Sequence, residues 1–291
     1  MPAIDLKEIQ TLEADLLQAI GTPSARPPVV PTLLDARRHA LLALHLGFTP
    51  AASPLLHVVG DSHAAFFAGS EGLRFHKGRR VWTGFFRIRY VSAFTELLPV
   101  FRVFHVGPAT AWQVEEPGSS TRAQEKIRTL LRSGDLPPAA RVLLVFGEID
   151  CRCHIPKAVL AGASVASATA ATVDRFMRLP RRLKAAGCEP SVWLPSLVPQ
   201  FGDVITPSDV DPLPVVGPQA LRDEITAVYC DTLRAACTAE GVRATGLTPP
   251  AADRLADCFL DGHHLSQRQM PAALVQAGIL PLASAPGTPP I

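Results

Sequence analysis

Three short apolar segments, each ending at a glycine, constrain the fold of this 291-residue chain more than any other feature. They are Leu55–Gly60, Phe101–Val106 before Gly107, and Arg141–Phe146 before Gly147. The third reads Val-Leu-Leu-Val-Phe without polar alternation, as a strand covered on both faces requires. Weaker strand patterns follow at residues 191–194 and 242–245. Helical patterns separate the strands, and this alternation predicts an α/β fold with a doubly wound parallel sheet of about five strands.

The pattern also predicts the domain organisation. Residues 51–283 form the main domain, and residues 1–50 form an N-terminal helical extension packed on it. Residues 284–291 are a short Pro-rich tail, expected to be disordered. Helices are predicted at Ser120–Arg132 with Ser120 or Thr121 as the cap, at Ala163–Ala186 with a break or kink at Pro180, at Ala220–Glu240, and at Leu265–Ile279.

Charge and composition exclude several classes of function. The formal net charge is +2 without a long basic block, which argues against a nucleic-acid partner. Neither a Gly-x-Gly-x-x-Gly motif nor a Walker motif occurs, so no cofactor is expected. The N-terminus does not resemble a secretory signal, and no apolar segment is long enough to span a bilayer. We therefore expect a cytoplasmic protein without a membrane partner and with six reduced cysteines, whose oligomeric state the sequence leaves open.

Polar and glycine residues follow three of the predicted strands directly. Ser62 follows the first strand, Gly107 the second, and the segment 147–154 the third. Ligands of open α/β sheets bind outside the carboxyl ends of the strands. The sequence therefore predicts that these three segments meet at one edge of the sheet.

Two distant motifs supply the parts of a nucleophilic hydrolase. Gly60-Asp61-Ser62-His63 offers a hydroxyl on a tight turn, and Asp261-Gly262-His263-His264 places a carboxylate three residues before a histidine. In this hypothesis Ser62 is the nucleophile, His264 the base that takes its proton, and Asp261 the acid that orients the base.

With these motifs the chain resembles the SGNH (GDSL-type) hydrolase family, over about residues 55–280. It resembles in particular a divergent bacterial subset with Gly-Asp-Ser-His and Gly-Glu-Ile-Asp-Cys-Arg. The resemblance implies a flavodoxin-like fold and esterase, lipase or acyl-transfer chemistry. It places Ser62, Asp261 and His264 in the catalytic positions, and the backbone N–H groups of Ser62 and Gly107 in the oxyanion hole.

The third family motif, Gly-x-Asn-Asp, is not conserved in this chain. The matching residues are Gly147-Glu148-Ile149-Asp150, so an isoleucine stands where the family has an oxyanion-donating asparagine. Loss of one such donor costs about a hundred- to a thousand-fold in rate. We interpret Arg152 as a candidate substitute donor. His63, Glu148, Asp150 and Arg152 are candidate substrate-binding residues, while Glu148, Asp150 and Arg152 could equally form a charge network that braces the loop.

Three functions fit this reading. The first is a serine esterase or acyl hydrolase that acts through an acyl-Ser62 intermediate on a small-molecule or carbohydrate ester. The second is an acyltransferase that uses the same serine. The third is a glycan- or metabolite-binding module that has lost catalysis. A metal site at Cys151-x-Cys153-His154 is not favoured, because no second Cys/His pair at metal-ligand spacing accompanies it.

Overall fold

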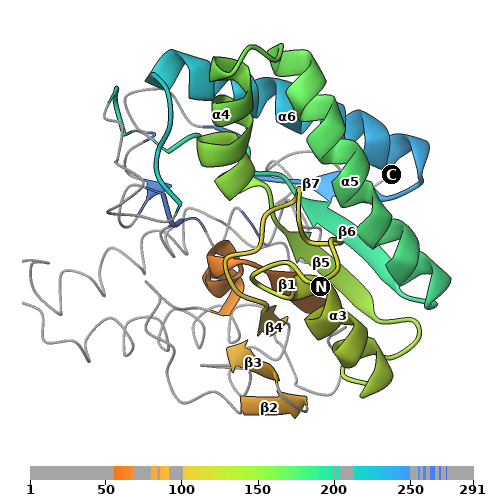
Figure 1. Cartoon of the computed structure of the whole chain (residues 1–291). Coiled ribbons are helices and arrows are strands. Elements are labelled where there is room, and N and C mark those ends of the chain that lie inside the picture. The colour runs from red at the N-terminus through yellow and green to blue at the C-terminus, as the bar shows by residue number, and fades with distance from the viewer. Residues whose placement is uncertain are drawn as a thin grey trace, which may run out of the picture.

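A single seven-stranded sheet is the centre of the fold (Figure 1). The computed structural model describes residues 56–68, 80–83, 86–91, 101–199, 201–203 and 213–249, with residues 255, 258, 259, 263–265, 269 and 273. The strand order is β2-β3-β4-β1-β5-β6-β7. Five strands are parallel: β4 (Phe101–His105), β1 (Leu56–Gly60), β5 (Arg141–Val145), β6 (Glu189–Trp193) and β7 (Arg243–Thr245).

These five parallel strands confirm the predicted α/β fold. Numbered along the chain, they lie in the order 2-1-3-4-5 across the sheet, which is the flavodoxin-like order. The other two strands, β2 (Arg80–Thr83) and β3 (Phe86–Val91), extend the sheet as an antiparallel pair beside β4. The sequence did not predict them, because their mixture of basic and aromatic residues is not a pattern typical of a buried strand.

Three long helices cover one face of the sheet. They are α3 (Ala123–Arg132), α5 (Val165–Ala185) and α6 (Gln219–Ala239), and Figure 1 shows α5 and α6 side by side. Strand residues of one pleat face, such as Val59 and Leu144, share a core with these helices. On the opposite face, Phe67 of the 3₁₀ helix η2 (Ser62–Ala68) packs edge-on against Trp193, with ring centroids 5.1 Å apart.

The helix boundaries correct the sequence prediction in two places. Helix α3 begins at Ala123 rather than near Ser120, after Arg122 in a left-handed conformation with φ 51° and no side-chain cap. Helix α5 continues through Pro180 as one element of 21 residues, so the predicted break is wrong. Its first turn is capped by the Ser164 hydroxyl, which accepts a hydrogen bond from the Ser167 N–H at 3.1 Å.

The connection from β5 to α5 contains two helical elements that the sequence did not predict. A π-helix, η3 (Asp150–His154), leads directly into the short helix α4 (Ile155–Leu160), which carries a proline in its first turn. In a π-helix each turn contains more residues than in an α-helix, so the side chains point in different directions than regular helical spacing suggests. This change matters for the site, because η3 follows Gly147 and Glu148.

Several predictions concern residues outside the described ones. The N-terminal extension, the tail, Asp261 and most of the predicted last helix belong to this group. Leu265, the expected first residue of that helix, instead pairs with Phe259 in an antiparallel bridge. None of the helices that the structure describes is long and apolar enough to cross a membrane. All six cysteines lie among the described residues, and each is a buried free thiol.

Candidate active site

The carboxyl ends of β1 and β4 bring Ser62 and Gly107 to the same level of the sheet. Gly60 is in register with His105, and Ser62 and Gly107 each lie two residues beyond this pair. The Val106 N–H donates to the Gly60 carbonyl at 3.0 Å, which extends the ladder past the strand ends. Among the described residues, neither the Ser62 nor the Gly107 backbone N–H has a hydrogen-bond acceptor. Two unused donors therefore follow adjacent strands at this edge.

Close contacts at the end of β5 require glycine at two positions, Gly60 on the neighbouring strand β1 and Gly147 just after β5. Val145 is in register with Gly60, and a Cβ at Gly60 would lie only 2.4 Å from the Val145 carbonyl oxygen. Gly147 follows with φ +109°, and a Cβ there would lie 2.6 Å from the hydroxyl of Tyr229. Both glycines allow a close approach of backbone that any side chain would prevent. The predicted convergence of the three segments at one sheet edge is thus observed.

Asp61 shapes the turn that presents Ser62. Its Oδ1 accepts a hydrogen bond from the His63 backbone N–H at 2.9 Å, as a capping carboxylate does at the first turn of a helix. The other oxygen, Oδ2, is buried and has no hydrogen-bond partner among the described residues. Burial raises the pKa of Asp61 to about 6, against the opposing effect of His63. The Asp61 carboxyl therefore stabilises the turn, and its burial carries a desolvation penalty.

Ser62 and His264 lie within hydrogen-bond reach of each other. The distance from His264 Nε2 to Ser62 Oγ is 3.0 Å, and both residues are partly buried. The neighbouring ring of His263 lies 3.9 Å from that of His264, between centroids. The predicted third member, Asp261, lies outside the described residues. The hydroxyl and imidazole of the hypothesis are therefore placed together, and the orienting carboxylate remains a prediction.

Two adjacent residues after β5, Glu148 and Ile149, contact different parts of the protein. The side chain of Ile149, at the position of the family asparagine, is 1% exposed and packs with Cys153 and Val216. Glu148 instead bonds His63 Nε2 at 2.9 Å with one carboxylate oxygen and Arg152 Nε at 2.8 Å with the other. Here sequence reasoning missed the pairing of Glu148 with His63, since nothing in the sequence indicates which side chains of two adjacent strand ends meet.

Charges within this cluster compensate each other despite burial. Burial alone would raise the pKa of Glu148, but His63 and Arg152 outweigh it and hold this pKa well below its usual range. Burial alone would lower the pKa of His63, but Glu148 and Asp61 outweigh it and raise that pKa. The cluster thus favours an ionised Glu148 beside a protonated His63.

Arg152 and Asp150 are both held by contacts within the protein. Besides Glu148, Arg152 donates to the Leu213 carbonyl, and it lines a separate pocket of about 260 Å³ that includes Arg222. Asp150 is fully buried, and its carboxylate accepts hydrogen bonds from the Ala111 N–H at 2.6 Å and the Trp112 N–H at 3.1 Å. Burial raises the pKa of Asp150 to about 7. These contacts match the bracing alternative better than direct substrate contact.

Lys126 is a further residue near the site that the sequence did not single out. Its Nζ donates to the Val106 carbonyl at 2.6 Å, directly before Gly107. The lysine lies on α3, whose first turn faces this loop, and no motif marks it. This contact stabilises the turn at Gly107.

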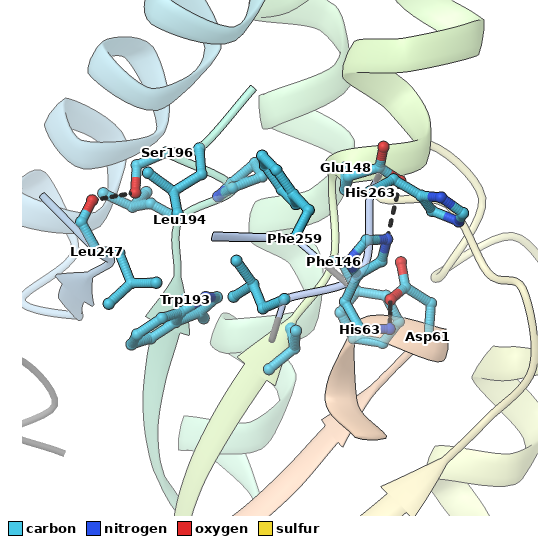
Figure 2. Close-up of a pocket in the computed structure, with 14 residues that line it drawn as sticks. Asp61, His63, Phe146, Glu148, Trp193, Leu194, Ser196, Leu247, Phe259 and His263 are labelled. Atoms are coloured by element: carbon cyan, nitrogen blue, oxygen red, sulfur yellow. Dashed lines mark hydrogen bonds and ion pairs between the residues drawn. The ribbon is translucent and has the colours of Figure 1, made fainter. Parts of the chain in front are cut away.

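A largely apolar pocket adjoins the Ser62–His264 pair. Its volume is about 470 Å³ including the open mouth. Figure 2 shows Asp61, His63 and Glu148 on one side, and Trp193, Leu194 and Leu247 on the other. Ser62 and His264 do not line it, although their chain neighbours do. The ring of His63 lines the pocket and also stacks on His264, with centroids 4.8 Å apart, so it stands between the pocket and the pair.

The described residues contain no group of three or more His, Cys, Asp or Glu side chains arranged to hold a metal ion. Cys151 and Cys153 are buried, and burial raises the pKa of both thiols. Raised thiol pKa values favour the protonated form, which is a poor metal ligand.

The chain matches no protein-family model and no curated protein. Among solved structures it is similar to the esterase EstA from Pseudoalteromonas sp., with 12% identity, 78% of this chain and 96% of that chain covered, and a TM-score of 0.42. It is also similar to phospholipase A1 from Streptomyces albidoflavus NA297, with 14% identity, coverage of 78% and 96%, and a TM-score of 0.33. A third is an extracellular lipase from Streptomyces rimosus, with 9% identity, coverage of 77% and 100%, and a TM-score of 0.34. At such identities and scores these similarities do not establish an activity for this chain.

Proposed function

We propose that the protein is a serine hydrolase of carboxylic esters that acts through an acyl-Ser62 intermediate. The observation that supports this proposal most directly is the 3.0 Å distance between Ser62 Oγ and His264 Nε2. A serine hydroxyl is a weak nucleophile at neutral pH, and an imidazole at this distance can accept its proton during attack. The unused N–H groups of Ser62 and Gly107 are suited to receive the negative charge that develops on the carbonyl oxygen.

The proposed reaction has two steps, acylation of Ser62 and then its deacylation. Ser62 Oγ attacks the carbonyl carbon, His264 takes the hydroxyl proton, and the carbonyl electron pair moves to oxygen. The tetrahedral adduct then collapses, the bond to the alcohol oxygen breaks, and His264 returns the proton to the leaving alcohol. Water, activated by His264, releases the acid from Ser62 in the same way. Asp261 is the proposed partner of the other His264 nitrogen.

The proposed substrate is an ester of a sugar or another small metabolite. The apolar wall of the pocket beside His63 suits the acyl group, and a small acyl group such as acetyl is the first choice. An acyltransferase would use the same intermediate with an alcohol in place of water. A binding module would keep the pocket without forming the acyl-enzyme.

Covalent labelling with a fluorophosphonate probe tests the proposal. The wild-type protein should be labelled at Ser62, and Ser62→Ala should lose the label while it unfolds at the same temperature. Hydrolysis of p-nitrophenyl acetate then separates the hydrolase from a transferase, which needs an added alcohol for turnover. A folded wild-type protein that the probe does not label would refute the enzyme hypothesis and favour the binding module.

A further inference from the structure

A continuous line of side-chain contacts leads from Arg152 to the nucleophile. Arg152 Nε lies 2.8 Å from one oxygen of Glu148, and the other oxygen lies 2.9 Å from His63 Nε2. The His63 ring then stacks on His264 at 4.8 Å with an interplanar angle of 30°. His264 in turn reaches Ser62 at 3.0 Å. The proposed base is thus in contact with a buried charged network that the mechanism above does not use.

Arg152, the residue of this series most distant from Ser62, is bound to the protein backbone. Arg152 also donates to the Leu213 carbonyl, and the Leu213 side chain packs against the cluster of Ile149, Cys153 and Val216. Both oxygens of Glu148 are therefore held by partners that cannot move freely. Because Glu148 accepts from Nε2, it selects the protonated state of that nitrogen and fixes the rotation of the His63 ring.

Stability alone is a weak explanation for these contacts. The side chains of Glu148 and Arg152 are each 8% exposed and that of His63 is 11% exposed. Buried ion pairs lose much of their attraction to the cost of desolvation, and apolar residues of similar size often stabilise a fold as well or better. A network that ends on the proposed base instead points to a role in orienting that base.

We propose that His63 is a positioning residue for His264, held in place by Glu148 and Arg152. This inference rests on the proposed function, because it assigns a role in the reaction of Ser62. The stacked ring of His63 supports one face of the His264 imidazole and keeps Nε2 directed at Ser62. Chemistry at Ser62 therefore depends on a glutamate and an arginine that touch neither substrate nor nucleophile.

Two variants test this support. Glu148→Gln removes the carboxylate that fixes the ring, and a small misplacement of a catalytic group can cost about a hundred-fold in rate. We expect this variant to label Ser62 with fluorophosphonate about 10- to 100-fold more slowly, and to lower kcat for p-nitrophenyl acetate with little change in KM.

His63→Phe keeps a ring against His264 but removes the nitrogen that Glu148 holds. Because Glu148 no longer fixes the rotation of this ring, we expect the variant to label Ser62 about 10- to 100-fold more slowly, with a fall in kcat and little change in KM. A merely structural role for His63 would not produce this split in a folded variant.

Matched controls keep the test decisive. Arg152→Lys retains a cation for Glu148 but loses the fork that also reaches the Leu213 carbonyl, so it should label faster than Arg152→Met, which should resemble Glu148→Gln. Glu115→Gln removes the carboxylate of a separate, partly buried ion pair with Arg182 that shares no contact with this network, and should leave the labelling rate unchanged.

The possible outcomes separate the two proposals. If wild type is labelled and folded Glu148→Gln is labelled at the same rate, the inference is wrong and the proposed function stands. If wild type is not labelled, the proposed function fails and the inference falls with it. Should Glu148→Gln not fold, equal labelling of Arg152→Lys and Arg152→Met would overturn the inference instead.

Discussion

His264 Nε2 lies 3.0 Å from Ser62 Oγ although 202 residues separate the two in the sequence. The sheet makes this contact possible, because it brings Ser62 to the edge at which β1, β4 and β5 all end. The ring of His263 lies directly beside that of His264, and our hypothesis assigns the role of base to His264 alone. Substitution of each ring in turn tests that distinction.

The first prediction therefore compares His264→Ala with His263→Ala. Loss of His264 removes the proton acceptor of Ser62, and we expect p-nitrophenyl acetate hydrolysis to fall by on the order of 10³-fold or more. Loss of His263 removes a ring that packs against the base and lines the pocket, so a decrease within about tenfold is expected. Initial rates at saturating substrate measure both. Equal losses in the two variants would contradict the assignment of His264 as the base.

The second prediction concerns the turn at Gly107. Lys126→Met keeps most of the aliphatic stem but removes the hydrogen bond to the Val106 carbonyl, which costs about 1 kcal/mol of unfolding free energy. Because this bond stabilises the turn at Gly107, whose N–H is a proposed oxyanion donor, we expect Ser62 labelling to slow by about tenfold, beyond what the small loss of stability explains. Urea unfolding and labelling rates check the two effects separately. A normal labelling rate would show that the Lys126 contact is not needed to position Gly107.

The sequence was sufficient for the parallel part of the fold. Continuous apolar runs such as Arg141–Phe146 can be buried on both faces, so they identify parallel strands without knowledge of their partners. Strands β2 and β3 were missed because their sequences mix basic and aromatic residues and lack a continuous apolar run. The seven-stranded sheet is therefore larger than the five strands predicted.

For the site, the sequence indicated the positions of Ser62 and His264 better than their surroundings. Ile149 and Glu148 are adjacent, yet Glu148 contacts His63 whereas Ile149 packs with Cys153 and Val216. A local motif cannot give these directions, because they depend on how the chain leaves β5. Contacts between strand ends, such as that of Glu148 with His63, depend on the three-dimensional arrangement in the same way.

A third prediction follows from the buried carboxyl of Asp150. Burial raises its pKa from 3.8 to about 7, so the folded protein binds this proton more tightly than the unfolded chain does. The stability that this group contributes is fully present below about pH 4 and is lost as the pH rises through about 7. Asp150→Asn carries no charge at any pH and still offers one oxygen acceptor. Relative to wild type, its unfolding free energy should rise between pH 4 and 8, by at most a few kcal/mol.

Urea denaturation of wild type and Asp150→Asn at several pH values measures this difference. Asp61, whose pKa burial raises to about 6, contributes in the same direction and is unchanged in the variant. A difference between the two proteins that is constant with pH would show that Asp150 is ionised across the whole range.

The fourth prediction uses a buried hydroxyl without a partner. The Tyr229 side chain is fully buried, and its hydroxyl makes no hydrogen bond among the described residues. Its removal in Tyr229→Phe should leave the unfolding free energy within about 1 kcal/mol of wild type or raise it, because desolvation of the hydroxyl is no longer required. Thr172→Val is a suitable control, since the Thr172 hydroxyl donates to the Ala168 carbonyl at 2.9 Å and its loss should destabilise. A larger loss in Tyr229→Phe than in the control would imply a hydrogen bond to that hydroxyl.

The fifth prediction tests whether the apolar pocket receives the acyl group. Leu247 is buried on the pocket wall opposite His63, and Leu247→Ala should deepen the pocket (Figure 2). One extra methylene in an apolar pocket is worth about 1 to 3 kcal/mol, so the ratio of p-nitrophenyl octanoate to p-nitrophenyl acetate hydrolysis should rise by about tenfold or more. Leu233→Ala removes an equally large side chain from the core between α6 and the sheet and costs a similar stability, but it leaves this ratio unchanged. If both variants keep the wild-type ratio, the acyl group binds elsewhere and the pocket serves the alcohol or no substrate at all.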